Sequence, residues 1–104
     1  VSNPCGKFFF LGKVFLQSAL SALRCYEHCL QLDNKQCALW IEYGSFVYTI
    51  HSFCSQRMKL ESFSLSLEQF EELESTKNKM LETAKQAFVN ANLIWYNNLV
   101  KNIK

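Results

Sequence analysis

The sequence predicts an all-α protein built of antiparallel helical hairpins, with about four helices. Three glycines and one proline among 104 residues leave long stretches without a helix breaker. An apolar content of 49% supplies enough side chains for a packed core. These apolar residues recur mainly at steps of three and four, which is the period of a helix rather than of a strand.

The first hairpin is expected over residues 3–34. Pro4 follows an asparagine, a combination that suits a helix start, and the helix should run to about Gln17. Ser18 or Ser21 then offers the cap of a second helix. The polar residues that follow Leu32 are expected to form the turn that ends it.

The second hairpin is expected over residues 35–93 and is longer. Its first helix carries apolar residues at helical spacing from Leu39 to Met58. The pattern then decays into a stretch rich in serine, at about residues 55–67, which we interpret as a loop.

A capping box marks the start of the fourth helix. Ser66 and Gln69 have the spacing at which each side chain satisfies the free backbone N–H of the other residue. The helix should continue to about Asn92. Residues 94–104 contain two adjacent asparagines, so we expect a partly ordered C-terminal extension there.

A pattern of aromatic, large and glycine residues occurs twice, 32 positions apart, beginning at Phe8 and at Trp40. Each copy is followed by an alanine and, four residues later, by an aromatic residue. Such alternation of small and large side chains is typical of helical hairpins that stack on copies of themselves. The residues of this repeat signature are Phe8, Leu11, Gly12, Phe15, Ala22, Tyr26, Trp40, Tyr43, Gly44, Val47, Ala84, Phe88 and Ala91.

The signature resembles the tetratricopeptide repeat, in which W-x-x-L-G-x-x-Y precedes A-x-x-x-F on a period of about 34 residues. The first copy is clipped by about two residues between Gly12 and Ala22. In the second copy, Gly44 and Ala84 are 40 residues apart, which implies an insertion of about 28 residues inside the hairpin. We expect this insertion to lengthen both helices into a projecting finger.

The lengthened hairpin makes the resemblance specific to one group of tetratricopeptide proteins. Residues 38–44 (ALWIEYG), 51–53 (HSF) and 80–85 (MLETAK) are similar to the calcineurin-binding proteins of the cabin type, which are relatives of a yeast Hir subunit. The resemblance covers most of residues 8–93. It implies a nuclear tetratricopeptide protein of the complex that deposits histones outside replication, with HIRA and ubinuclein subunits as partners.

The resemblance also implies a face on which partners bind. In repeats of this kind the first helix of each hairpin lines the concave surface, where an extended peptide or a helix can lie. The candidate residues on that face are Phe9, Lys13, Ile41, Ser45 and Tyr48.

Charge and composition argue against several other classes of protein. A formal charge of +2 is too small to indicate a nucleic-acid surface. The longest uncharged stretch, residues 43–56, is shorter than the roughly 20 apolar residues of a membrane span. Five cysteines without a regular disulfide spacing favour a reducing compartment, nuclear or alternatively cytoplasmic.

The cysteines leave open an alternative of a different functional class, namely a metal-binding or redox domain. Cys25, His28 and Cys29 share one turn, with Cys37 further on, and soft ligands at such spacing can hold zinc. A packed free thiol explains them more simply. A cysteine nucleophile would need an orienting group and a pocket, and no motif in the sequence indicates either.

We therefore expect a non-enzymatic interaction scaffold without a cofactor. Because the chain begins at Val1, we expect it to be a piece of a longer protein, in which neighbouring repeats are further partners. A generic tetratricopeptide adaptor with another partner, in the nucleus or the cytoplasm, remains open beside the histone-chaperone assignment.

Overall fold

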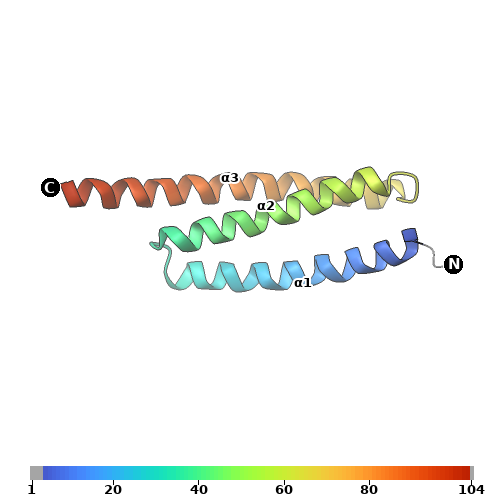
Figure 1. Cartoon of the computed structure of the whole chain (residues 1–104), viewed down its shortest axis with the longest axis horizontal. Helices are drawn as coiled ribbons and strands as arrows, with labels where there is room; N and C mark the ends of the chain where they lie inside the picture. Colours follow the sequence, from blue (N-terminus) through green and yellow to red (C-terminus); the bar gives the residue numbers. More distant parts are fainter. Residues whose placement is uncertain (1–3, 104) are drawn as a thin grey trace.

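The computed structural model describes the backbone of residues 4–103 and the side chains of residues 14–103. Three helices follow one another, and they are α1 (Pro4–Leu32), α2 (Cys37–Leu60) and α3 (Leu67–Ile103). No strand occurs in this part of the chain, so the predicted all-α class is confirmed. Each helix runs antiparallel to the one before it along an elongated molecule of 66 × 22 × 19 Å (Figure 1).

The core lies mainly between α2 and α3. From α2, Val47, Ile50 and Cys54 have no exposed surface. Opposite them α3 presents several small side chains, which let the two helices approach closely. The buried residues of α3 are Leu73, Met80, Ala84, Ala87 and Ala91.

Gly44 lies where α2 and α3 approach each other closely. A Cβ atom built on Gly44 would lie 3.0 Å from Cε1 of Phe88 and 3.2 Å from Cβ of Ala87. These separations are shorter than ordinary van der Waals contact, so a side chain at position 44 would push α3 away. The glycine therefore suits the close spacing of the two helices, and its φ angle is not positive.

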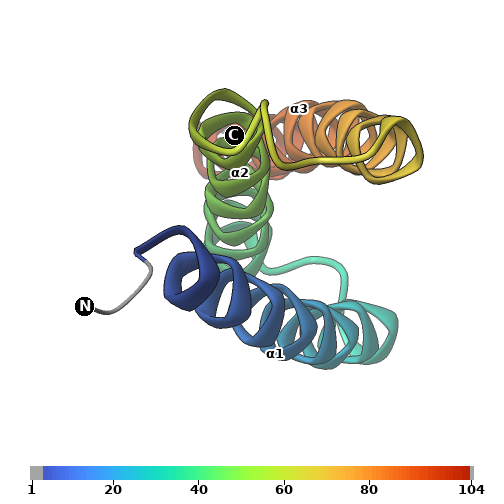
Figure 2. The ribbon, with the colours of Figure 1, turned by 90° about the vertical axis from the view of Figure 1, so that its right-hand side faces the viewer.

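The second face of α2 packs on α1. Ala19, Leu23 and Leu30 of α1 are buried there. The Phe15 and Phe53 rings add a contact with centroids 4.6 Å apart. The end-on view in Figure 2 shows α1 and α3 on different sides of α2, and no Cα atom of α1 lies within 8 Å of one in α3 among the described residues.

The predicted first hairpin over residues 3–34 is wrong, because α1 is one continuous helix, and the described residues hold three helices rather than four. The serines proposed as caps lie inside α1. The hydroxyl of Ser21 donates to the Gln17 carbonyl at 3.2 Å, the internal bond that a serine makes within a helix. With Ala19 and Leu23 buried against α2, packing holds the helix intact across the predicted break.

The predicted turn after Leu32 is confirmed. The backbone N–H of Lys35 donates to Asp33 Oδ1 at 3.0 Å, and the Gln36 side chain donates to the other oxygen of that carboxylate. The indole N–H of Trp40 donates to the Asn34 carbonyl at 2.8 Å. This turn fixes the entry of the chain into α2.

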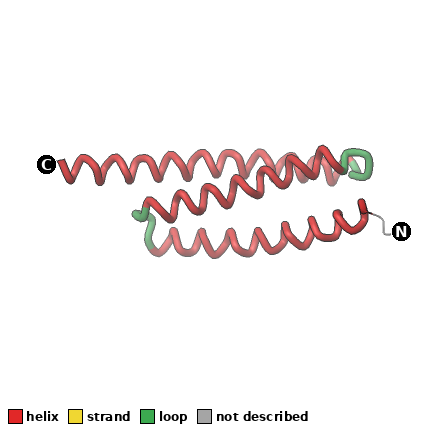
Figure 3. The backbone as a smooth tube through the Cα atoms, in the orientation of Figure 1, coloured by secondary structure: helices red, strands yellow, loops and turns green. Residues whose placement is uncertain are grey.

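The connection between α2 and α3 is shorter than the predicted loop of residues 55–67. It covers residues 61–66 only, one of the two short loops drawn in Figure 3. The preceding serines stay helical because α2 continues to bury residues on α3, including Cys54 and Arg57. Helix α2 ends at Leu60.

A buried ion pair organises this end of the hairpin. Nε of Arg57 donates to Oε2 of Glu61 at 2.8 Å, with side-chain exposures of 8% and 3%. The Glu61 backbone carbonyl accepts from the N–H groups of Ser64 and Leu65 at 3.0 and 3.1 Å. Glu61 therefore both ends α2 and shapes the loop, although its Oε1 atom has no hydrogen-bond partner among the described residues.

The predicted capping box is confirmed at the start of α3. The N–H of Ser66 donates to Gln69 Oε1 at 3.0 Å, and the N–H of Gln69 donates to the Ser66 hydroxyl at 3.1 Å. The predicted extension of residues 94–104 is wrong in that α3 continues to Ile103. Each of Asn97 and Asn98 costs less than about 0.7 kcal/mol relative to alanine within a helix. This cost is too small to stop a helix that is already formed.

Replacing Gly44 with leucine tests the close approach of α2 and α3. The added side chain must displace Phe88 or Ala87, so Gly44→Leu should destabilise the protein by about 1–3 kcal/mol. Thermal unfolding followed by circular dichroism should show a lower Tm. Ser62→Leu, in the exposed loop, is the matched control and should leave the Tm nearly unchanged. Equal effects of the two substitutions would contradict the assigned packing.

Replacing Arg57 with methionine tests the buried ion pair. The substitution leaves the Glu61 carboxylate buried without its cation and should cost about 3–5 kcal/mol. Urea unfolding measures this loss. The double variant Arg57→Met/Glu61→Leu removes both charges and should recover most of the stability, so a double variant as unstable as the single one would argue against the pair.

Candidate interaction surface

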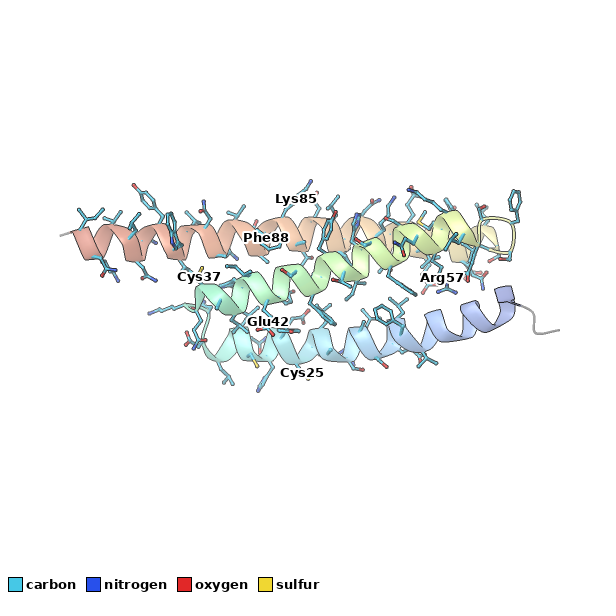
Figure 4. The ribbon with its side chains drawn as sticks, in the orientation of Figure 1. Cys25, Cys37, Glu42, Arg57, Lys85 and Phe88 are labelled. Atoms are coloured by element: carbon cyan, nitrogen blue, oxygen red, sulfur yellow. The ribbon has the colours of Figure 1, made fainter. Side chains whose placement is uncertain are left out.

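The structure brings together the repeat-signature residues of α2 and α3. Tyr43, Gly44 and Val47 are buried against α3, where Ala84 and Ala91 are also buried. Figure 4 shows Phe88 on α3 opposite the first half of α2, and its ring lies against Gly44. The structure thus brings together two segments that the predicted insertion separates in the sequence.

Aromatic residues of the signature join α1 to α2. The Tyr26 ring lies 6.2 Å from the Tyr43 ring, and Trp40 meets Tyr43 edge-on at 6.1 Å. The Tyr26 hydroxyl donates to Oε1 of Glu42 at 3.1 Å, and Figure 4 shows Glu42 between the two helices. Burial, followed by this bond to the carboxylate, raises the pKa of Tyr26. Burial, with the nearby charge of Glu27, raises the pKa of Tyr43.

The remaining signature residues are less informative. Phe15 is partly exposed on α1, and Ala22 is half-buried. Phe8, Leu11 and Gly12 lie outside the described side chains. In the clipped first copy of the repeat, the described contacts are therefore those of Phe15 with Phe53 and of Tyr26 with Tyr43.

The predicted partner face is exposed where it is described. Ile41, Ser45 and Tyr48 lie along α2 at steps of four and three, and all three are exposed. Phe9 and Lys13 fall outside the described side chains. Tyr48 packs on the His51 ring at a centroid distance of 5.4 Å, and His51 Nδ1 lies 3.0 Å from the Lys77 carbonyl of α3.

A groove beside Ile41 extends this face onto α3. It has a volume of about 290 Å³ and is lined by residues of both helices. The Cys37 thiol at its edge donates to the Ala91 carbonyl at 3.3 Å. The lining residues are Cys37, Ile41, Phe88, Ala91, Asn92 and Trp95. Sequence reasoning named Ile41 here but missed Trp95, because residues 94–104 were expected to be only partly ordered.

Beyond Ala91, α3 continues past the start of α2 and carries apolar side chains without a neighbouring helix (Figure 1). Five of them are exposed, although residues of this kind are normally covered. These exposed residues are Leu93, Trp95, Tyr96, Leu99 and Ile103. Of these residues, Trp95 lines the groove beside Ile41.

The cysteines and histidines considered for metal binding do not converge. Cys25 and Cys29 are exposed on α1, and Figure 4 shows Cys25 far from Cys37 at the start of α2. Among the described residues, no group of three His, Cys, Asp or Glu side chains could hold a metal ion. In the part of the chain that was searched, no helix has the length and apolar content needed to cross a membrane.

Thiol labelling should follow burial. Cys25 and Cys29 are exposed, whereas Cys54 is fully buried and burial raises the pKa of its thiol. A maleimide at neutral pH should therefore modify Cys25 and Cys29 within minutes and Cys54 only when the protein unfolds. Peptide mapping by mass spectrometry, in native buffer and in guanidinium chloride, measures the order. Labelling of Cys54 as fast as Cys25 in native buffer would contradict the packing of α2 on α3.

Comparison with known proteins leaves the family open. No protein-family model matches the chain, and no solved structure matches it significantly.

Proposed function

We propose that the chain is a non-enzymatic protein interaction scaffold of tetratricopeptide type, part of a nuclear histone-chaperone assembly. The observation that carries the proposal is the uncovered apolar surface that runs from Ile41 across the groove to Trp95 and along the end of α3. Exposed apolar residues grouped on one side of a helix pair are typical of surfaces that bind protein.

The composition of this surface supports a protein partner over other ligands. It combines aromatic and aliphatic side chains with asparagines, and its groove lining carries no charged residue. Depletion of charge and enrichment of aromatic residues are typical of the centres of protein interfaces. A nucleic acid would need basic side chains along the same path.

Two features support the assignment to the cabin-type family. The segments 38–44 and 80–85, which carry the resemblance, lie on α2 and α3, the two helices that make the main interface. Their small residues, Gly44 and Ala84, are buried there. A long antiparallel pair is what the resemblance expects, and HIRA and ubinuclein subunits are the partners that it implies.

Affinity capture with the full-length parent protein from nuclear extract tests this function. The unmodified protein should retain HIRA and ubinuclein subunits. Trp95→Asp, which introduces a charge into the groove, should reduce their recovery at least about tenfold, the loss expected for an aromatic anchor. Quantitative mass spectrometry measures the recovery.

The matched control is Phe63→Asp, which changes another exposed aromatic residue at the loop end of the molecule. It should leave recovery unchanged. Recovery of a different, Trp95-dependent set of proteins would support the generic adaptor instead. Recovery of no specific protein would contradict the scaffold function.

A further inference from the structure

A second concave surface lies between α1 and α3, on a different side of the molecule from the groove beside Ile41. Three hollows of about 320, 200 and 350 Å³ follow one another along α1. The first two share Leu20 and are lined by both α1 and α3, so together they form the trough. The third shares Glu27 and Tyr43 with the middle hollow but is lined by α1, α2 and the turn between them. Helix α2 forms its floor, because α1 and α3 do not approach each other.

The walls of this α1–α3 trough have the spacing of a helix-binding surface. Apolar residues of α1 project at steps of four and three from Leu16 through Leu20 to Leu23, and Leu73 and Met80 of α3 face the trough from the other side. Rows at this spacing accept the ridges of another helix. The 11 positions from Leu16 to Glu27, the part of α1 that lines the trough, correspond to about 16 Å, or three helical turns.

The space between α1 and α3 indicates the shape of a ligand that would fit there. Both helices run in the same direction along α2 (Figure 1). One further helix lying between them would touch both walls and complete a four-helix arrangement. Leu20 is the residue to which such a helix would bind most directly, since it is 36% exposed and lines two of the hollows.

The charged residues that line the trough indicate which charge a bound ligand should carry. Arg24 of α1 and Lys79 of α3 both line the middle hollow, and neither has a salt-bridge partner among the described residues. Glu27 is the one carboxylate that lines this hollow, so its formal charge is +1. A carboxylate on the occupant would compensate this charge at the middle of the trough.

We propose that the α1–α3 trough binds an amphipathic α-helix of a partner protein along about three turns. Its apolar side chains would pack on the row around Leu20, and an acidic residue at its centre would lie between Arg24 and Lys79. This inference rests on the proposed scaffold function and adds a second binding site, with the chemistry of its ligand.

Binding of two designed peptides to the purified chain tests the proposal. Each is a fluorescein-labelled, helix-forming 18-residue peptide of Ala, Leu and Gln with leucines at steps of three and four. One carries a central Glu and the other a central Lys. Fluorescence anisotropy should show the Glu peptide binding roughly fivefold tighter, as expected for two partly exposed ion pairs.

Three variants of the chain locate the site. Leu20→Asp should weaken binding of the Glu peptide at least about tenfold, because a charge replaces the central apolar contact. The double variant Arg24→Glu/Lys79→Glu should reverse the preference in favour of the Lys peptide. Val89→Asp changes an exposed apolar residue of α3 that lines no described hollow, and it should leave both affinities unchanged.

Several results would overturn the proposal. These are failure of both peptides to bind, binding that is insensitive to Leu20→Asp, and an unchanged preference in the double variant. Sedimentation that shows a dimer dissociated by Leu20→Asp would instead assign the trough to a second copy of the chain. Loss of nuclear partners on Trp95→Asp, without peptide binding in the trough, would leave the scaffold function standing and remove only this site.

Discussion

The close approach of α2 and α3 is the constraint on which the rest of the structure depends. It requires Gly44 on one helix and alanines at positions 84, 87 and 91 on the other, since larger side chains would separate the two backbones. With the helices this near, Val47, Ile50 and Cys54 lose all their exposed surface. Helix α1 packs on α2 of this hairpin.

The two ends of the hairpin are held in different ways. At the loop end, Arg57 and Glu61 form a buried ion pair, and backbone hydrogen bonds to Glu61 close the chain into α3. At the other end, α2 begins at Cys37 beside Ala91, and α3 continues alone. At the loop end, Oε1 of Glu61 is the one buried side-chain oxygen without a hydrogen-bond partner among the described residues. At the other end, apolar side chains of α3 are exposed.

This asymmetry has a functional consequence. Because α1 and α3 lie on different sides of α2, the chain has two concave surfaces rather than one closed core. The groove beside Ile41 is uncharged along its lining, whereas Arg24, Glu27 and Lys79 line part of the α1–α3 trough. The two surfaces thus suit two different protein ligands, and a scaffold that joins partners would need such a pair.

The sequence by itself determined the all-α class, the turn after Leu32 and the capping box at Ser66. Each follows from local chemistry or from the helical period of the apolar residues. Whether Ser18 and Ser21 cap a helix or lie within one was decided only by the tertiary structure, because serine suits both positions and burial of Ala19 and Leu23 favours the continuous helix. The same holds for the ion pair of Arg57 with Glu61, for the exposure of Trp95 and for the trough, since these depend on how far apart the helices lie in space.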